Sequence, residues 1–452
     1  VHAMGHSFLS SSPYSPSHRS FLNTRHIALD AIPGLDSSIA ARQVLAQAKP
    51  ELGKLKETQH VDYEGHKSVH QRLLNALYNV FQQDAPDQAR EDFEAFRAES
   101  GESLAQFARL EAAAAVCLTD LCCRTFANQN LPNADCEIFH AWLQWVADCQ
   151  LAGAQQTACK AGMSLGLYLD FAVGARRDGA EGFCERRAIA KNVSVGAPPD
   201  RLNPDGQNWN LTAYAPRKLA AQSYRPFRRL LAATMRHAGV VRIDHVLGLS
   251  RSFWIPDDGT PGGYVRQPFE ALLAIIKIEA EKSGTTVVGE DLGLVPQGFR
   301  KSLRDSGIYG YSVMQYERDE TGRLNPGHYP SSHVLSCFST HDTPTIRGFE
   351  VGRDIHWWRK LGWIGDAACS QAQEQRQEDV RQLVSERPSA DFTTSVHTLL
   401  SSSPAAMVTA QLDDILDHED AQNLPGTTTE HLNWRRKYHV PVEQISDDDR
   451  FR

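Results

Sequence analysis

The sequence lacks an apolar run long enough to cross a membrane. Apolar stretches such as 271–276 fall well short of the roughly 20 residues that a membrane span requires. An excess of basic residues is also missing, because the formal net charge at pH 7 is -8. Such a balance provides no basic surface for nucleic acid or for anionic lipid. We therefore expect neither a nucleic acid nor a membrane as a partner.

Cysteines are few and are not spaced as metal ligands. Of the 9 cysteines, Cys122 and Cys123 are adjacent and the others are scattered. We interpret them as reduced thiols and expect no metal site and no cofactor. Residues 1–6 show neither the basic region nor the apolar region of a secretory signal, so we expect a cytoplasmic location. The sequence does not predict an oligomeric state.

Three apolar stretches, 240–245, 285–291 and 334–342, each lead into acidic residues. Apolar, β-branched runs of this kind are typical of buried strands that present chemistry at their carboxyl ends. The acids of interest are Asp244, Glu290 and Asp342. They lie roughly fifty residues apart, more than the roughly 30 of a bare strand-helix unit in an α/β barrel, so we expect insertions between the strands.

Helical patterns alternate with these strands. The helices are expected at 223–238, 267–283 and 297–306. A further strand is expected at 164–171, and a last one at 405–410. Strands that alternate with helices indicate a parallel α/β sheet. With 452 residues and 41% hydrophobic residues, the chain is long enough for one TIM-type (β/α)8 barrel with helical and loop-rich insertions, which is the fold class we predict.

The expected domain organisation follows the changes in pattern along the chain. Residues 1–40 are expected to begin the catalytic barrel, with a short strand at 27–29. Residues 41–150 repeat apolar side chains at helical spacing and are expected to form a helical insertion subdomain. Residues 151–452 are expected to form the remainder of the barrel. Within this range, residues 195–209 are dense in Gly, Pro, Asn and Asp, which favours a loop-rich insertion at about 174–215.

Seven short motifs connect the expected strands and loops. They are Ser12-Pro13-Tyr14, Gly166 to Gly174, Asn203 to Trp209, Arg242-Ile243-Asp244-His245, Gly289 to Gly293, Ser339 to Asp342, and Asn423 to Thr427. In this order they resemble the 4-α-glucanotransferases, or amylomaltases and disproportionating enzymes, of glycoside hydrolase family 77 in the α-amylase superfamily. The resemblance runs over most of the chain and is closest to the bacterial maltodextrin-pathway branch.

The chain departs from this family's pattern at several places, including Leu169 in place of a common arginine and the absence of an expected tryptophan near Phe349 to Gly352. Asn210 stands where the family usually has glycine. The family also carries a first barrel strand ahead of Ser12-Pro13-Tyr14, so we expect a truncated N-terminus with that strand absent. A barrel without one strand keeps an unpaired edge.

The resemblance implies a chemistry that needs two carboxyl groups. A retaining enzyme uses one to attack the anomeric carbon and the other to protonate the leaving oxygen. We expect Asp244 to be the nucleophile and Glu290 the acid/base, with a pKa raised by burial and by neighbouring carboxylates. Arg242, two residues before Asp244 on the same strand face, is expected to hold that carboxylate ionised.

The remaining site residues are expected to contact sugar. By the resemblance, Asp342 binds hydroxyls of the distorted sugar, with His341 and His245 as neighbouring donors. The expected acceptor-side contacts are Tyr14, Gln207 and Trp209. Asp170 and Asn423 are further expected contacts. Alternatives are open, since the aromatic residues suit loop anchors and the last two residues suit backbone capping.

The function that the resemblance implies is transfer of 4-α-glucanosyl segments between maltooligosaccharides and other α-1,4-glucans, through a covalent glycosyl-enzyme on Asp244. Two alternatives are open. One is an α-1,4-glucan hydrolase that uses the same carboxylates. The other is a truncated, inactive relative that only binds α-glucan.

Overall fold

The structure is a computed structural model that describes residues 11–119, 134–199, 206–325, 332–389 and 391–451. The adjacent cysteines Cys122 and Cys123, and the part of one motif from Asn203 to Asp205, lie outside the described residues. The chain divides into two compact units. Unit 1 comprises residues 1–58, 62–198 and 208–287, and unit 2 comprises residues 59–61, 199–207 and 288–452. No helix in the described ranges is long and apolar enough to cross a membrane.

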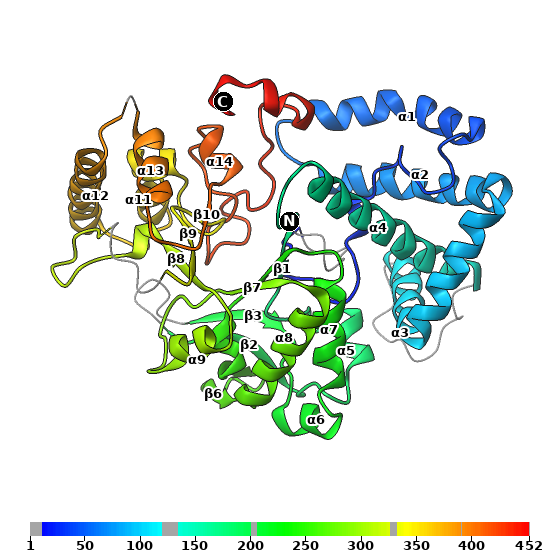
Figure 1. Ribbon diagram of the computed structural model, residues 1–452, viewed down its shortest axis with the longest axis horizontal. Helices are drawn as coiled ribbons and strands as arrows, with labels where there is room; N and C mark the ends of the chain where they lie inside the picture. Colours follow the sequence, from blue (N-terminus) through cyan, green and yellow to red (C-terminus); the bar gives the residue numbers. More distant parts are fainter. Residues whose placement is uncertain (1–10, 120–133, 200–205, 326–331, 390, 452) are drawn as a thin grey trace. The chain divides into compact units, whose positions relative to one another are not determined.

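Helices dominate the first third of unit 1, as their apolar spacing predicts. These elements are η1 (Thr24–His26), α1 (Ile39–Glu57), α2 (Tyr63–Asp84), α3 (Asp87–Thr119) and α4 (Ala134–Lys160) (Figure 1). The side chains of Ser38 and Asp62 accept hydrogen bonds at the starts of α1 and α2. Gly101 interrupts α3 with a φ of 54°. Trp142 of α4 is fully buried and its ring lies 5.7 Å from that of Phe81 in α2.

Two glutamines of α4 hold the segment that leads into these helices. Gln144 accepts a hydrogen bond from the backbone N–H of Leu22 at 2.8 Å and donates one to its carbonyl at 3.0 Å. Gln150 makes the same pair of bonds with Ala28, at 2.8 and 2.9 Å. The strand predicted at 27–29 is therefore wrong. Side-chain amides satisfy the backbone groups that a neighbouring strand would have paired.

Unit 1 also contains the start of the parallel sheet. Strands β1 (Tyr168–Phe171), β4 (Val240–Ile243) and β7 (Thr286–Gly289) follow the order β1-β4-β7. β1 and β4 pair in parallel, with Asp170 opposite Arg242. Every residue of β4 is buried, in keeping with its apolar, β-branched run. Helices α7 (Arg225–Met235) and α8 (Phe269–Ser283) form where they were predicted, and the boundary between the units falls within β7.

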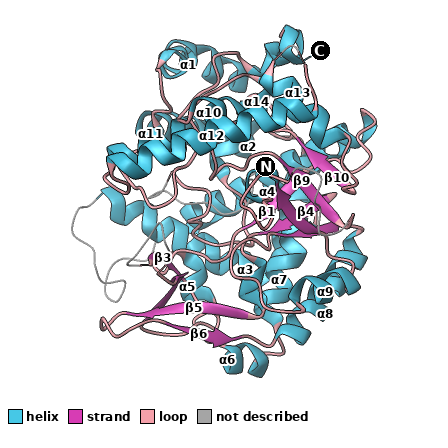
Figure 2. Cartoon of the chain, turned by 90° about the vertical axis from the view of Figure 1, so that its left-hand side faces the viewer, coloured by secondary structure: helices cyan, strands magenta, loops and turns pink. Residues whose placement is uncertain are grey.

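A four-stranded sheet lies outside the predicted pattern. Its order is β3-β2-β5-β6 and its strands are β2 (Val193–Ala197), β3 (Gln207–Leu211), β5 (Arg251–Pro256) and β6 (Gly263–Arg266) (Figure 2). Residues 174–215, whose composition favours loops, thus also contain β2, β3 and helix α5 (Ala180–Cys184). Helix α6 (Pro216–Ala221) and the 3-10 helix η2 (Val246–Leu249) complete the short elements. Because β2 pairs with β5, which is far along the chain, local composition does not reveal it.

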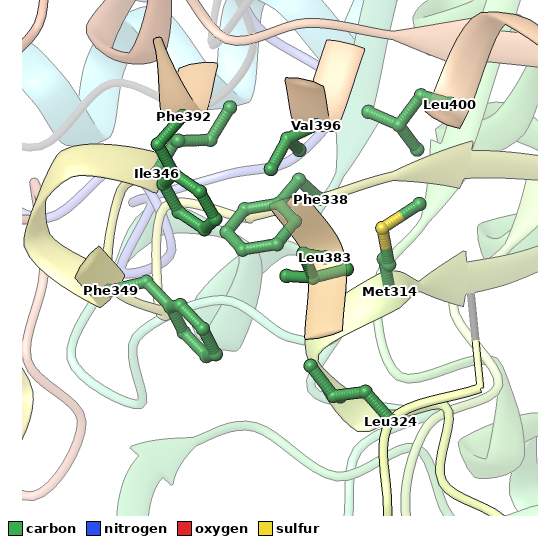
Figure 3. Close-up of a cluster of buried hydrophobic side chains, with 9 residues drawn as sticks. All are labelled: Met314, Leu324, Phe338, Ile346, Phe349, Leu383, Phe392, Val396 and Leu400. Atoms are coloured by element: carbon green, nitrogen blue, oxygen red, sulfur yellow. The ribbon is translucent and has the colours of Figure 1, made fainter. Parts of the chain in front are cut away.

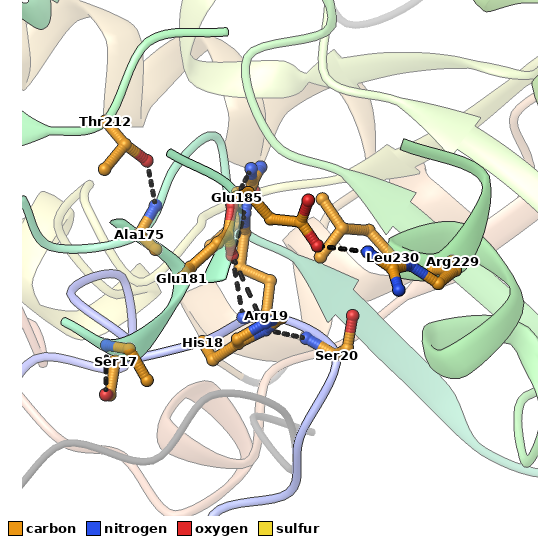
Figure 4. Close-up of polar contacts among 12 residues, drawn as sticks. Ser17, His18, Arg19, Ser20, Ala175, Glu181, Glu185, Thr212, Arg229 and Leu230 are labelled. Carbon is orange, nitrogen blue, oxygen red and sulfur yellow. Dashed lines mark hydrogen bonds and ion pairs between the residues drawn. The ribbon is translucent and has the colours of Figure 1, made fainter. Parts of the chain in front are cut away.

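A buried ion pair fixes the chain beyond the carboxyl end of β1 (Figure 4). Arg19 Nη2 lies 2.6 Å from Glu181 Oε1, and the two side chains are 5% and 0% exposed. Tyr214 donates a further hydrogen bond to Glu181 at 3.1 Å. Arg19 Nη1 donates to the carbonyls of Ala172 and Val173, the two residues that follow β1. This pair therefore holds the turn that comes directly after Asp170 and Phe171.

Unit 2 contains the second parallel sheet. Strands β8 (Gly310–Val313), β9 (Val334–Cys337) and β10 (Met407–Thr409) pair in parallel in the order β10-β9-β8. The predicted strands at 334–338 and 405–410 are confirmed. Val288, in the second half of β7, forms a parallel bridge with Tyr309, directly before β8. Among the described residues, the parallel strands form two three-stranded sheets and no closed barrel.

Some of the helices of unit 2 enclose an apolar core beside β9. The helices of this unit are α9 (Phe299–Asp305), η3 (Met314–Tyr316), α10 (Ile346–Val351), α11 (Arg353–Lys360), α12 (Asp366–Glu386), α13 (Phe392–Ser401), α14 (Leu412–Ile415), η4 (Val442–Asp447) and η5 (Asp449–Phe451). Phe338, which follows β9 directly and is 1% exposed, lies among side chains from α10, α12 and α13 (Figure 3). This packing fixes the start of the loop that carries Asp342.

Candidate active site

Asp244 follows β4 directly and is ion-paired with Arg242. Arg242 Nη1 lies 3.0 Å from Asp244 Oδ1 and 2.8 Å from Asp170 Oδ2. The side chains of these three residues are between 10% and 18% exposed, so little water screens the charges. The guanidinium group of Arg242 thus contacts both Asp170, near the end of β1, and Asp244, directly after the neighbouring strand β4. The positive charge of Arg242 therefore lies within ion-pair distance of both carboxylates.

Tyr14 belongs to the same cluster. Its hydroxyl donates a hydrogen bond to Asp170 at 2.5 Å and lies 3.4 Å from Arg242 Nη1. Burial raises the pKa of the Tyr14 phenol well above its usual value, and the negative charge of Asp170 raises it further, whereas Arg242 opposes the effect. Tyr14 is therefore a permanent hydrogen-bond donor. Four predicted site residues, Tyr14, Asp170, Arg242 and Asp244, are brought into direct contact.

His245 and Trp209 form a second contact of unit 1. Their rings meet edge to face with centroids 5.4 Å apart. Burial lowers the pKa of His245 to about 4, so the imidazole is neutral at physiological pH. Next to Trp209, Asn210 has a φ of 53°, a backbone conformation that glycine and asparagine adopt more readily than other residues. The asparagine thus fits a position where the family usually has glycine.

A small cavity adjoins these residues. It has a volume of about 90 Å³, and Asp244, His245, Arg19 and Tyr214 are among its lining residues. The cavity thus lies beside the end of β4, where Asp244 follows the strand.

Glu290 and Asp291 of unit 2 have different surroundings. Glu290 is 9% exposed and accepts a hydrogen bond from the backbone N–H of Leu292 at 3.2 Å. Asp291 is 3% exposed, forms an ion pair with Arg300 at 2.7 Å and accepts a hydrogen bond from the backbone of Tyr311. The side chain of Asp291 is thus engaged by Arg300 and by the backbone of β8.

Asp342 is held by two other predicted residues. Asn423 Nδ2 donates to Asp342 Oδ1 at 2.6 Å, and His341 Nε2 lies 3.5 Å from Asp342 Oδ2. The backbone N–H of Asn423 donates to the carbonyl of His341 at 3.0 Å. The Asp342 side chain is 44% exposed, which leaves it accessible to a ligand. Trp434, which the sequence did not indicate, places its ring 5.4 Å from that of His341.

Asp414 fastens both ends of the loop that carries Asp342. Ser339 Oγ donates to Asp414 Oδ2 at 2.6 Å, and the backbone N–H of Ile346 donates to Asp414 Oδ1 at 2.7 Å. Asp414 is 2% exposed, and burial raises its pKa to about 6, although these hydrogen bonds act in the opposite direction. Sequence reasoning missed Asp414, because nothing in the doublet Asp413-Asp414 distinguishes it from a helix start.

Tyr316 is a further residue that the sequence did not indicate. Loss of hydration first, and then negative charges, raise the pKa of its phenol above the usual value. The charges come from Asp342, Asp354 and Glu290. Tyr316 therefore lies within electrostatic reach of two predicted catalytic acids of unit 2, as a protonated donor.

A cavity of about 420 Å³ in unit 2 opens onto this group. Among its lining residues are Gln207, Tyr316, Asp342 and Asn423, so three predicted residues line one space. Aromatic side chains contribute much of the wall, namely Tyr316, Phe349, Trp357, Trp358 and Trp363. Such a volume and such a mixture of aromatic and polar side chains are typical of small-molecule sites. In the described ranges, no group of three or more His, Cys, Asp or Glu side chains is placed to hold a metal ion.

The fold is similar to that of solved amylomaltases. The structure of amylomaltase from Corynebacterium glutamicum matches with a TM-score of 0.89 at 28% identity, over 100% of this chain and 68% of that one. Amylomaltase from Streptococcus agalactiae in complex with acarbose matches with a TM-score of 0.76 at 18% identity, over 99% of this chain and 88% of that one. The class is therefore that of the amylomaltase-like α/β proteins.

Sequence comparison defines the family. The family model described as 4-alpha-glucanotransferase matches residues 1–443, and the chain belongs to this family. A 4-alpha-glucanotransferase of Mycobacterium tuberculosis is 32% identical over 451 residues, which cover 94% of this chain and 62% of the relative. One of Haemophilus influenzae is 34% identical over 331 residues, covering 69% of this chain and 47% of the relative. The chain thus spans about three fifths of the length of its Mycobacterium relative.

Proposed function

We propose that the chain is a retaining α-1,4-glucan glucanotransferase that moves 4-α-glucanosyl segments between maltooligosaccharides. The observation that carries this proposal is the ion pair between Arg242 and Asp244 at the end of β4. A nucleophilic carboxylate must be ionised and accessible, and the pair with Arg242 and the place of Asp244 in the lining of a cavity support this assignment. Family membership supplies the reaction and the substrate class.

Asp244 attacks the anomeric carbon while Glu290 gives its proton to the departing glycosidic oxygen. The glycosidic bond breaks, a carbon–oxygen bond to Asp244 forms, and the shortened glucan leaves. Glu290 then takes the proton from an acceptor hydroxyl, whose oxygen displaces Asp244. Two inversions at the same carbon give retention. The proposal is supported by the sequence pattern, because Asp244 directly follows β4 and Glu290 directly follows β7.

Asp342 binds hydroxyls of the reacting sugar and strengthens these bonds as the ring approaches the oxocarbenium-like transition state. Asn423 and His341 fix the orientation of Asp342 and offer further donors. Tyr14 and Trp209 provide aromatic surface for sugar rings, and neighbouring polar groups bind hydroxyls. The proposed polar contacts are Asp170, Arg242, Gln207 and His245.

The finer fold and domain assignments belong to the same proposal. We propose that β1, β4, β7, β8, β9 and β10, which follow one another in chain order, are strands of a (β/α)8 barrel. Residues 41–150 would be a helical insertion into it. A cytoplasmic location remains the prediction made from the sequence.

Incubation with maltotriose tests the proposal. Transfer yields glucose together with maltodextrins longer than maltotriose, whereas the hydrolase alternative yields glucose and maltose alone. Asp244→Asn is expected to abolish transfer, because the amide is a poor nucleophile. The matched control is Asp258→Asn, which changes an exposed aspartate outside both cavities. Equal activity of Asp244→Asn and the wild type refutes the nucleophile assignment. Binding of maltotriose without any turnover favours the inactive binding relative.

A further inference from the structure

The cavity that Asp342 borders has a second group of sugar-compatible side chains, carried by helix α11 and the residues after it. Three of the 8 tryptophans of the chain fall between residues 357 and 363. All three line the cavity. The backbone N–H of Trp363 donates to the carbonyl of Trp358 at 2.9 Å, so these two residues lie one turn apart at the end of the helix.

The three indoles differ in what already contacts them. The ring of Trp357 has Lys360 Nζ 4.2 Å from its centroid, and His431 meets it edge to face with centroids 5.0 Å apart. The indole N–H of Trp357 donates a hydrogen bond to Asp420 at 3.4 Å. In the part of the chain that the structure describes, no ring or cation stacks on the indoles of Trp358 and Trp363. Both side chains are partly exposed and line the cavity.

The charges that line the cavity exclude an anionic ligand as its natural occupant. Each lining arginine is matched by a carboxylate, at 2.6 to 2.8 Å. The pairs are Arg318 with Asp379, Arg353 with Asp420, and Arg376 with Asp354. A cavity with aromatic walls and neutralised cations suits a neutral ligand with one apolar face and many hydroxyls, because aromatic faces stack on the apolar faces of pyranose rings.

Helix α11, which carries Trp357 and Trp358, is held rigidly against its neighbours. Asp354, in the first turn of α11, is 8% exposed and forms two hydrogen bonds with Arg376 of α12, at 2.9 and 2.8 Å. Arg376 in turn lies 3.8 Å above the ring of Phe349. Side chains held on a fixed helix lose little conformational freedom when a ligand binds, which favours affinity.

We propose that Trp358 and Trp363 form an additional subsite for one glucose unit of a longer α-1,4-glucan, beyond the unit held at Asp342 in the same cavity. The inference rests on the proposed function for its ligand class. It makes these two residues determinants of chain-length preference. They act on binding and not on the bond-breaking step, because neither belongs to the carboxylate group.

The test compares maltotriose with maltoheptaose. For Trp358→Ala and Trp363→Ala, we expect KM for maltoheptaose to rise about five- to tenfold, the effect of losing one ring stacking contact. KM for maltotriose and kcat for both substrates are expected to stay within about twofold. Trp358→Phe retains an aromatic face and is expected to keep most of the preference. The control is Tyr264→Ala, which removes a 44%-exposed aromatic side chain outside the cavity.

A binding measurement separates failure of this inference from failure of the proposed function. Calorimetric titration with maltoheptaose is carried out in the Asp244→Asn background, with and without Trp358→Ala. Weaker binding by about five- to tenfold supports the subsite even if the wild type shows no transfer from maltotriose. Unchanged binding, or an equal loss for maltotriose and maltoheptaose, overturns it. If the alanine variant does not fold, Trp358→Leu removes the aromatic face while it keeps most of the volume.

Discussion

The buried pair of Arg19 and Glu181 makes a quantitative prediction for Glu181→Gln. Burial alone would raise the pKa of the Glu181 carboxyl, but the charge and hydrogen bonds of Arg19 outweigh it and lower the pKa from 4.5 to about 2. Since each pKa unit corresponds to about 1.4 kcal/mol, the charged form contributes about 3 kcal/mol to folding at neutral pH. This contribution is complete above pH 4.5 and is lost as the pH falls towards 2.

A second argument gives the same magnitude. In Glu181→Gln the guanidinium of Arg19 stays buried without its countercharge, and breaking a buried pair in this way costs about 3 to 5 kcal/mol. We therefore expect urea denaturation at pH 7, followed by tryptophan fluorescence, to show a loss of about 3 kcal/mol. The control is Glu51→Gln, because the pair of Glu51 with Arg72 is more than half exposed and is worth at most about 1 kcal/mol.

The double variant Arg19→Met/Glu181→Leu separates charge from positioning. Because it leaves no unpaired buried charge, it is expected to recover part of the stability. The double variant still removes the donor to the carbonyls of Ala172 and Val173, which follow β1. Its transfer rate should therefore be lower than that of the wild type. A Glu181→Gln variant that unfolds within about 1 kcal/mol of the wild type would refute the reasoning, since a buried unpaired guanidinium must cost more than that.

Three further predictions concern the core, the loop and pH. Phe338→Ala should lower the free energy of unfolding by about 3 to 5 kcal/mol in urea, because it empties the centre of a packed cluster. Asp414→Ala should lower the free energy of unfolding by about 2 kcal/mol or more and should also lower kcat. Asp414→Asn keeps an acceptor for the Ile346 N–H, so it should retain more stability and a higher kcat than the alanine variant. Equal kcat values for the wild type and Asp414→Ala would contradict a positioning role. Burial lowers the pKa of four histidines of unit 1 from 6.5 to about 4, namely His18, His70, His140 and His245. Between these values the unfolded chain binds protons that the fold does not, so Tm should fall from pH 7 to pH 5. The carboxyls of Glu111 and Asp414, whose pKa values are raised to about 7 and about 6, offset this fall only in part. His140→Leu should flatten the slope of Tm against pH, and a constant Tm would contradict the prediction.

The strands that carry the predicted acids were visible in the sequence because their signal is local. Val240 to Ile243 and Val334 to Cys337 are short apolar runs that end in polar motifs, and they form β4 and β9. The proximity of Arg242 to Asp244 also follows from strand periodicity, since residues two apart share a face.

What the sequence did not reveal depends on partners far along the chain. β2 becomes a strand through β5, and Asp414 gains its position through Ser339 and Ile346. The three tryptophans near residue 360 are visible in the sequence as a local cluster, but their spacing along the chain does not indicate which of them line a cavity. Tertiary contacts decide such cases.

The glutamines of α4 couple two regions in a way that can be observed without any ligand. Leu22 and Ala28 donate their amide protons to side chains of a helix more than a hundred residues later. Hydrogen–deuterium exchange at these two amides therefore reports on the opening of α4 and not on the local segment. Because backbone amides outside regular helices and strands normally exchange fast, slow exchange at both positions would be the solution signature of an intact helical region.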